Sequence, residues 1–199
     1  METMEGSGGS SEQRSLDLEE KKILKVMVAL DESDGSCYAL QWTLDYLIKR
    51  HRMGHVEELT RLILVHAQPP IYPFVYYAAG PVGVYATPTV SEAMVKAQNE
   101  NAKALLSRAL SICKENMVKA ETIIVKGDPK ETICQTAEDL HVDLLIMGSR
   151  GLSSLKRAFL GSVSDYCAHH AHCPILIVKP PKETKKQEQA CKHSGFSEQ

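Results

Sequence analysis

The sequence lacks the segments that would place it in a membrane or in an oxidising compartment. No window approaches the roughly 18 uninterrupted apolar residues that cross a bilayer, and no apolar N-terminal segment resembles a signal peptide. The six cysteines form no CxxC pair and sit mostly within apolar patterns. We therefore expect a soluble cytoplasmic protein, with the nucleus as an additional location, whose thiols are reduced and buried.

Three motifs of nucleotide-binding and hydrolytic proteins are also missing. There is no GxxxxGK[ST], which excludes a P-loop lysine, and no GxGxxG, which weakens a dinucleotide-binding interpretation. No GxSxG elbow follows a predicted strand, so a Ser-His-Asp hydrolase is not expected. Any nucleotide-binding or hydrolytic site in this chain must therefore be built from a motif other than these three.

Charge and composition divide the chain into three parts. Residues 1–20 carry a net charge of −5 with a Gly/Ser cluster, and we predict a disordered tail there. Residues 182–199 form a polar tail with a net charge of +1, which leaves +2 for a single domain at 21–181. A domain so close to neutral lacks the basic surface of a nucleic-acid-binding protein.

Strand and helix patterns alternate through this domain. Short aliphatic runs predict strands at 23–30, 61–67, 121–127, 143–148 and 174–179. Helical spacing follows the first strand after a cap at Ser33 or Asp34, begins again near Ser91, resumes at Pro129 behind an Asp128 cap, and starts a last time after Gly161. The order predicts a three-layer α/β/α fold around a five-stranded parallel sheet.

The second predicted helix has the longest apolar stripe. The stripe comprises Val95, Ala102, Leu105, Leu106, Ala109, Ile112 and Cys113. We expect this face to pack on the sheet.

The stretch MGSRGLSSLKRAFLGSVSD (147–165) follows the fourth predicted strand and combines three glycines with five serines. In parallel sheets, ligands bind beyond the carboxyl ends of the strands, so Gly148 and Asp31 are expected to face one crevice. The amides that open the helix after Gly161 would suit an anion such as phosphate. The alternative is that these residues form only a turn and a helix start.

The same stretch carries a resemblance to a known family. It matches G-x2-G-x9-G-[ST], the signature of the ATP-binding branch of the universal stress protein family. VMVALDESDGS, LILVHAQPP and HCPILIVK resemble the family's first, second and last strands, and GPVGVYATPTV resembles an insert of plant single-domain members. The resemblance implies the adenine nucleotide alpha hydrolase-like sheet, in the strand order 3-2-1-4-5, and a homodimer.

The resemblance also implies which residues would bind ATP or AMP. Asp31 would accept hydrogen bonds from the ribose, the backbone of Ala67 would meet the adenine edge, and the residues after Gly161 would hold the outer phosphates. The full set comprises Ala29, Leu30, Asp31, Ala67, Met147, Gly148, Arg150, Gly151, Gly161, Ser162, Val163 and Ser164.

The function implied is that of a nucleotide-responsive regulatory or protective module in the stress response. One alternative is a slow ATPase or phosphotransferase with Mg²⁺ held near Ser162 and Ser164 and Asp165 as the candidate base. A nucleotide-free, chaperone-like interaction protein is the other. No catalytic residue and no resident metal site are predicted.

Several further features allow more than one interpretation. CAHHAHC (167–173) has enough ligands for zinc but is expected to be structural. The Tyr/Pro-rich loop 68–89 is either a lid or a partly packed insert, and Lys156 and Arg157 are either phosphate ligands or solvated. The last strand, 174–179, is an apolar sheet edge and is predicted to form the homodimer interface.

Overall fold

The computed structural model describes residues 23–49, 60–71, 74–75, 84–85, 88–151 and 160–181. Both predicted tails lie outside these ranges. So do Lys156, Arg157 and most of the loop 68–89, of which Phe74–Val75 (β3) and Val84–Tyr85 (β4) pair as a short antiparallel ribbon.

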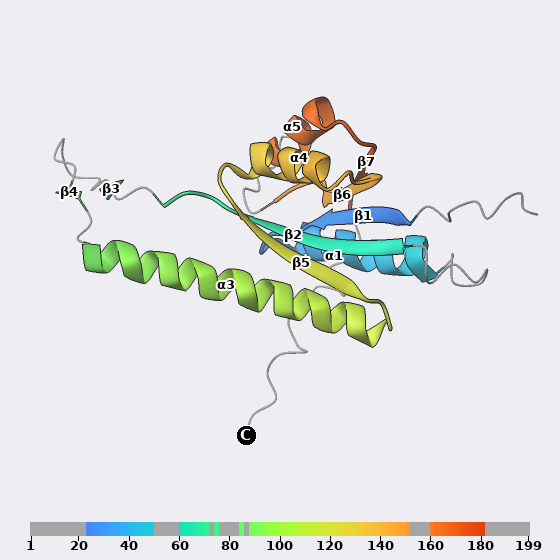
Figure 1. Cartoon of the computed structure of the whole chain (residues 1–199), viewed down its shortest axis with the longest axis horizontal. Helices are drawn as coiled ribbons and strands as arrows, with labels where there is room; N and C mark the ends of the chain where they lie inside the picture. The colour runs from blue at the N-terminus through green and yellow to red at the C-terminus, as the bar shows by residue number, and fades with distance from the viewer. Residues whose placement is uncertain are drawn as a thin grey trace, which may run out of the picture.

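Five parallel strands form the central sheet, as the sequence predicted (Figure 1). They are β1 (Leu24–Ala29), β2 (Thr60–Gln68), β5 (Ala120–Lys126), β6 (Leu144–Gly148) and β7 (Ile175–Val178). Their order is β5-β2-β1-β6-β7, which is 3-2-1-4-5 in chain order. The order reverses between β1 and β6, which are paired from Val26 opposite Leu144 to Val28 opposite Ile146, so the expected crevice lies beyond these two strands.

The first and third crossover helices begin at caps that the sequence predicted. The helix α1 (Asp34–Trp42) starts at Ser33, whose side chain accepts from the Ser36 amide, and α4 (Pro129–Asp139) starts at Asp128, whose side chain accepts from the Lys130 amide. A π-helical segment, η1 (Thr43–Ile48), continues α1. At that junction the Thr43 hydroxyl donates to the Ala39 carbonyl at 2.7 Å. This side-chain hydrogen bond competes with the backbone hydrogen bonds of the helix.

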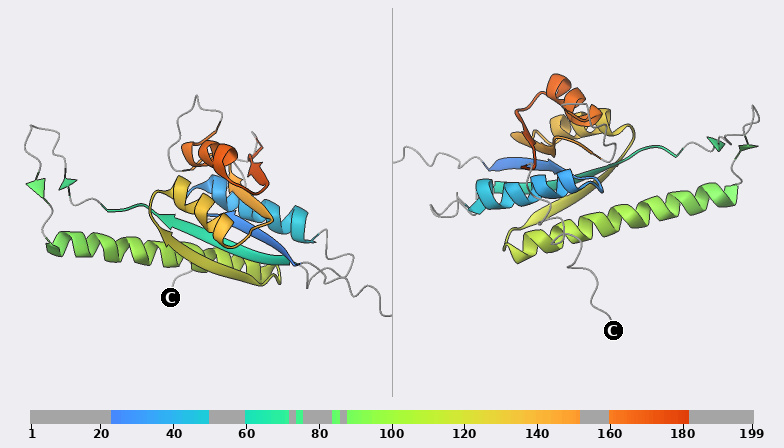
Figure 2. Two further views of the ribbon diagram at one scale, coloured as in Figure 1. Left: turned by 45° about the horizontal axis from the view of Figure 1, so that its top comes forward. Right: turned by 180° about the vertical axis from the view of Figure 1, so that it is seen from behind.

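Two hydrophobic cores cover the two faces of the sheet. On one face, α1, η1 and α3 (Pro88–Glu115) pack on Val26, Val28, Leu62 and Leu64. On the other face, α4 and α5 (Ser162–His170) pack on Met27, Ile63 and Leu145 and on the end of β6. Figure 2 shows the sheet between these two helical layers.

The helix α3 differs from its prediction at its N-terminal end. It begins at Pro88 rather than near Ser91, and its first turns extend past the sheet (Figure 1). The prediction that Val95 belongs to the buried stripe was wrong, because its side chain is 41% exposed where no strand lies beneath it. Ala102, Leu106, Ala109 and Cys113, further along, are buried as predicted.

None of the helices in the described ranges is long and apolar enough to cross a membrane.

Candidate functional site

A cavity of about 690 Å³ opens at the carboxyl edge of the sheet. Its floor comes from the ends of β1, β2 and β6, and its walls come from α3, α4 and the start of α5. All twelve residues predicted for nucleotide binding line it: Ala29, Leu30, Asp31, Ala67, Met147, Gly148, Arg150, Gly151, Gly161, Ser162, Val163 and Ser164. The fold thus brings together residues that lie more than a hundred positions apart in the chain.

The carboxylate of Asp31 has a fixed orientation. Its Oδ1 accepts from the Ser33 amide at 3.1 Å and from the Ser33 hydroxyl. The Ser36 hydroxyl donates to the Asp31 carbonyl at 2.7 Å and accepts from the Asp31 amide at 3.2 Å. With Oδ1 held in this way, Oδ2 remains on the side of Gly151, where it can accept hydrogen bonds from a ligand.

Gly151 leaves the space that this orientation needs. A Cβ on Gly151 would lie 2.6 Å from Asp31 Oδ2, closer than nonbonded atoms approach. Any side chain at position 151 would therefore displace the carboxylate or fill the cavity beside it.

Gly148 has a packing role that the sequence did not reveal. A Cβ there would lie 2.7 Å from the backbone carbon of Gly35, and a Cβ on Gly35 would lie 2.7 Å from the Arg150 carbonyl oxygen. These two glycines let the start of α1 contact the end of β6 backbone to backbone, which holds Asp31 against the glycine loop.

The start of α5 forms one end of the cavity. Its N-cap, Gly161, has an extended backbone and makes no side-chain cap bond, in contrast to Ser33 on α1 and Asp128 on α4. The first intrahelical bond runs from the Asp165 amide to the Gly161 carbonyl, and the Gly161 amide donates to the Ser149 carbonyl, so the amides between them, from Ser162 to Ser164, need other partners. Because these amides carry the positive end of the helix dipole, an anion would satisfy them.

The opposite end of the cavity is largely apolar. Ala67 and Met147 come from the strand ends, and Pro129 and Ile133 come from α4. His66 Nδ1 lies 2.8 Å from the Leu30 carbonyl oxygen, and because a carbonyl can only accept, this nitrogen carries the proton. A flat heteroaromatic group fits such a wall, since it offers apolar faces and polar edges.

Five residues of α3 complete the cavity and were not predicted to line it. They are Met94, Ala97, Gln98, Asn101 and Ala102. Gln98 also anchors the helix by donating to the Pro69 carbonyl at 2.8 Å. Sequence reasoning treated this helix as a core element only. Its apolar stripe gives no sign that the first half passes the strand ends.

The CAHHAHC segment divides between a buried and an exposed surface. Cys167 is fully buried, whereas His169, His170 and His172 are exposed. Burial and the neighbouring Cys134 thiol raise the pKa of Cys167, so this thiol stays protonated. No group of three or more potential ligands in the described ranges is arranged to hold a metal ion.

Comparison with known proteins identifies the family. The family model of the universal stress protein family matches residues 22–179, nearly the whole described part of the chain. The chain belongs to the universal stress protein family. This confirms the resemblance found in the sequence.

Relatives within the family come from plants and bacteria. The chain is 30% identical over 167 residues to a universal stress protein A-like protein of Arabidopsis thaliana, covering 78% of this chain and 89% of the relative. A crystal structure of an Arabidopsis thaliana universal stress protein family protein with AMP bound is 28% identical, with a TM-score of 0.56 over 84% of this chain and 98% of that one. Universal stress protein UspA of Lactobacillus plantarum shares the fold, with 22% identity and a TM-score of 0.61 over 79% of this chain and 98% of that one.

Proposed function

We propose that this universal stress protein binds an adenine nucleotide, AMP or ATP, in the cavity beyond β1 and β6. The single observation that supports this most strongly is the placement of the Asp31 carboxylate and the uncapped start of α5 around one cavity. A carboxylate for sugar hydroxyls and free amides for phosphates match the polar parts of a nucleotide. The AMP bound to the Arabidopsis protein that is 28% identical agrees with this proposal.

Each part of the nucleotide would meet residues of suitable chemistry. The ribose hydroxyls would donate to Asp31 Oδ2, and the base would pack among Ala67, Met147 and Ile133. The phosphates would accept from the amides of Ser162 and Val163. The Ser164 hydroxyl already donates to the Gly161 carbonyl at 3.0 Å, so it stabilises the start of the helix more than it serves a ligand.

We propose further that the bound nucleotide acts as a signal and not as a substrate. Phosphoryl transfer needs a positioned base and strong stabilisation of charge. Asp165, the candidate base, is exposed and does not line the cavity, and Asp31 is committed to the ribose. The protein would then be a regulatory or protective module of the stress response, in the cytoplasm and as a homodimer.

Mass spectrometry of released nucleotide tests the binding proposal. Protein purified without added nucleotide is denatured, and the supernatant is analysed for AMP, ADP and ATP. The wild type should release an adenine nucleotide, and Gly151→Val should release none because the new side chain meets Asp31. Ser107→Val, which places the same side chain on the exposed side of α3, is the control and should release as much as the wild type. Equal release from Gly151→Val would place the nucleotide elsewhere.

A turnover assay distinguishes a regulatory module from a slow ATPase or phosphotransferase. Purified protein with ATP and Mg²⁺ should show no steady release of phosphate above a buffer blank. Steady turnover that is abolished in Asp165→Asn would instead make the protein a slow ATPase or phosphotransferase. Failure to bind any nucleotide at millimolar concentration would favour the chaperone-like alternative.

A further inference from the structure

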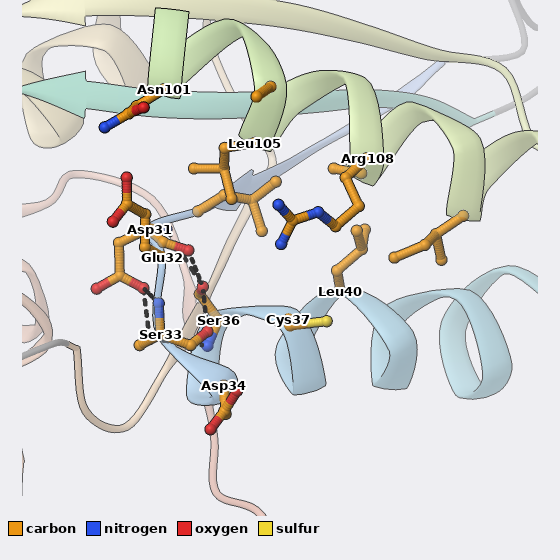
Figure 3. Close-up of a pocket in the computed structure, with 14 residues that line it drawn as sticks. Asp31, Glu32, Ser33, Asp34, Ser36, Cys37, Leu40, Asn101, Leu105 and Arg108 are labelled. Atoms are coloured by element: carbon orange, nitrogen blue, oxygen red, sulfur yellow. Dashed lines mark hydrogen bonds between the residues drawn. The ribbon is translucent and has the colours of Figure 1, made fainter. Parts of the chain in front are cut away.

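A second pocket, of about 350 Å³, lies between α1 and α3 and adjoins the nucleotide cavity (Figure 3). The two share five lining residues: Leu30, Asp31, Glu32, Ser36 and Asn101. Beyond them the second pocket continues away from the strand ends along the two helices. Its volume lies within the range of small-molecule sites.

The middle of this pocket is apolar. On α3, Leu105 and Ile112 stand two turns apart and face the pocket, and Leu40 faces it from α1. Leu40 is 1% exposed, and Leu105 and Ile112 are half-buried against the same core. This wall would bury an aliphatic chain.

Two opposite charges line the pocket. Glu32 lies near Asn101 at the end next to the nucleotide cavity, and the Arg108 guanidinium lies between Leu105 and Leu40, as Figure 3 shows. Asn101 and Arg108 are seven residues apart on one helix, which corresponds to about 10 Å along its axis. Neither Glu32 nor Arg108 forms an ion pair with any residue of the described ranges.

We infer that this pocket binds a linear zwitterion with an apolar middle, such as an ω-amino acid or a short apolar peptide. Its ammonium group would pair with Glu32 and its carboxylate with Arg108, while the chain between them would lie on Leu105 and Leu40. A fatty carboxylate that pairs with Arg108 would leave Glu32 unpaired, and an alkylammonium that pairs with Glu32 would leave Arg108 unpaired. Only a ligand with both charges pairs with both residues.

Calorimetric titration of the full-length protein tests this assignment. The probes are ω-aminooctanoate, octanoate and octylammonium, which differ in the charges at their ends, and trileucine, which tests the peptide form. We expect ω-aminooctanoate or trileucine to bind at millimolar concentration or below, and the two single-charge probes to bind about tenfold more weakly, which corresponds to the loss of one charge pair of about 1.4 kcal/mol.

Variants confined to the second pocket supply the specificity control. Arg108→Gln should lower the affinity for the zwitterion about tenfold. Ala104→Leu, at an exposed position that lines the pocket, should prevent the zwitterion from binding. Lys114→Gln removes a positive charge elsewhere on α3 and should have no effect. AMP titration of the same samples should be unchanged in all three, because none of these residues lines the nucleotide cavity.

The outcomes separate this inference from the proposed function. Equal binding of octanoate and ω-aminooctanoate, or binding that survives Arg108→Gln, would overturn the zwitterion site even if AMP binds normally. The same holds if neither ω-aminooctanoate nor trileucine binds at millimolar concentration. If the zwitterion binds and AMP does not, the second site stands and the nucleotide proposal fails.

Discussion

Asp31 illustrates how one residue is prepared for binding before any ligand arrives. One carboxylate oxygen is held by the amide and hydroxyl of Ser33, which is also the N-cap of α1. The Ser33 hydroxyl therefore both caps α1 and helps to orient the Asp31 carboxylate. A ligand does not have to bring the carboxylate into position, which lowers the entropic cost of binding.

We predict that Ser33→Ala weakens nucleotide binding as well as stability. Loss of the cap should cost about 1 kcal/mol of unfolding free energy, and loss of the hydroxyl that holds Asp31 Oδ1 should reduce AMP affinity several-fold. Asp128→Ala is the matched control, because it removes the cap of α4 but leaves Asp31 untouched. Urea denaturation and AMP titration measure the two effects. Equal AMP affinity in both variants would mean that Ser33 does not position the carboxylate.

The buried thiol of Cys113 makes the stability of the fold depend on pH in the alkaline range. Burial raises the pKa of this thiol from its ordinary value near 9 to about 11, because the folded state disfavours the thiolate. The group therefore contributes stability below pH 9 that is lost as the pH rises toward 11. We expect the unfolding free energy of Cys113→Ala to be lower at pH 8 but to fall less between pH 9 and pH 11. Parallel pH profiles of the wild type and the variant would contradict this.

The contacts of individual residues were harder to predict than their positions. Asp31 and Gly151 could be assigned to one crevice because parallel strands end at the same edge and a family signature fixes the spacing. That Gly35 must be small could not be predicted, because the close approach of α1 to β6 depends on the packing of helix on sheet. Val95 was assigned to the core because periodicity identifies a helix face but not where the sheet beneath it ends.

At the scale of elements, β7 leaves one edge of the sheet without a partner in the described ranges. The carbonyls of Pro174 and Val178 accept from β6, at Leu145 and Ser149, so by alternation the N–H groups of Ile175 and Ile177 point to the open edge. Both side chains are half-buried beside α5. This backbone edge can pair with a second copy of the strand.

We predict that Ile177→Pro converts a dimer into a monomer without unfolding the domain. Proline removes an outward N–H and none of the bonds to β6, and it is tolerated at such edge positions. Light scattering at increasing concentration measures the assembly, and circular dichroism checks that the fold is kept. A wild-type protein that remains monomeric at high concentration would contradict the interface at 174–179, as would a dimer that survives the substitution.

For the whole molecule, the proposed nucleotide cavity draws its walls from both layers of helices as well as from the sheet. A ligand there contacts elements of both hydrophobic cores, so it binds the folded chain and not the unfolded one. Binding is therefore linked to global unfolding through mass action.

We predict that AMP raises the melting temperature. At a hundredfold excess over the dissociation constant the folded state gains about 2.7 kcal/mol, which corresponds to a shift of about 5 to 10 °C for a chain of this size. Differential scanning calorimetry measures the shift, and Gly151→Val serves as the control because its cavity is blocked. An equal shift in the variant would show that AMP acts outside the cavity.

The length of α3 has a consequence for how quickly a ligand can leave. One half of this 28-residue helix is buried through Leu106 and Ala109, and the other half lines the cavity through Met94 and Gln98. Because both halves belong to one helix, an outward tilt of the cavity wall must also disturb the core beneath its buried half. We therefore expect the residence time of a nucleotide to depend on core packing, and Leu106→Ala, remote from the proposed site, to shorten it.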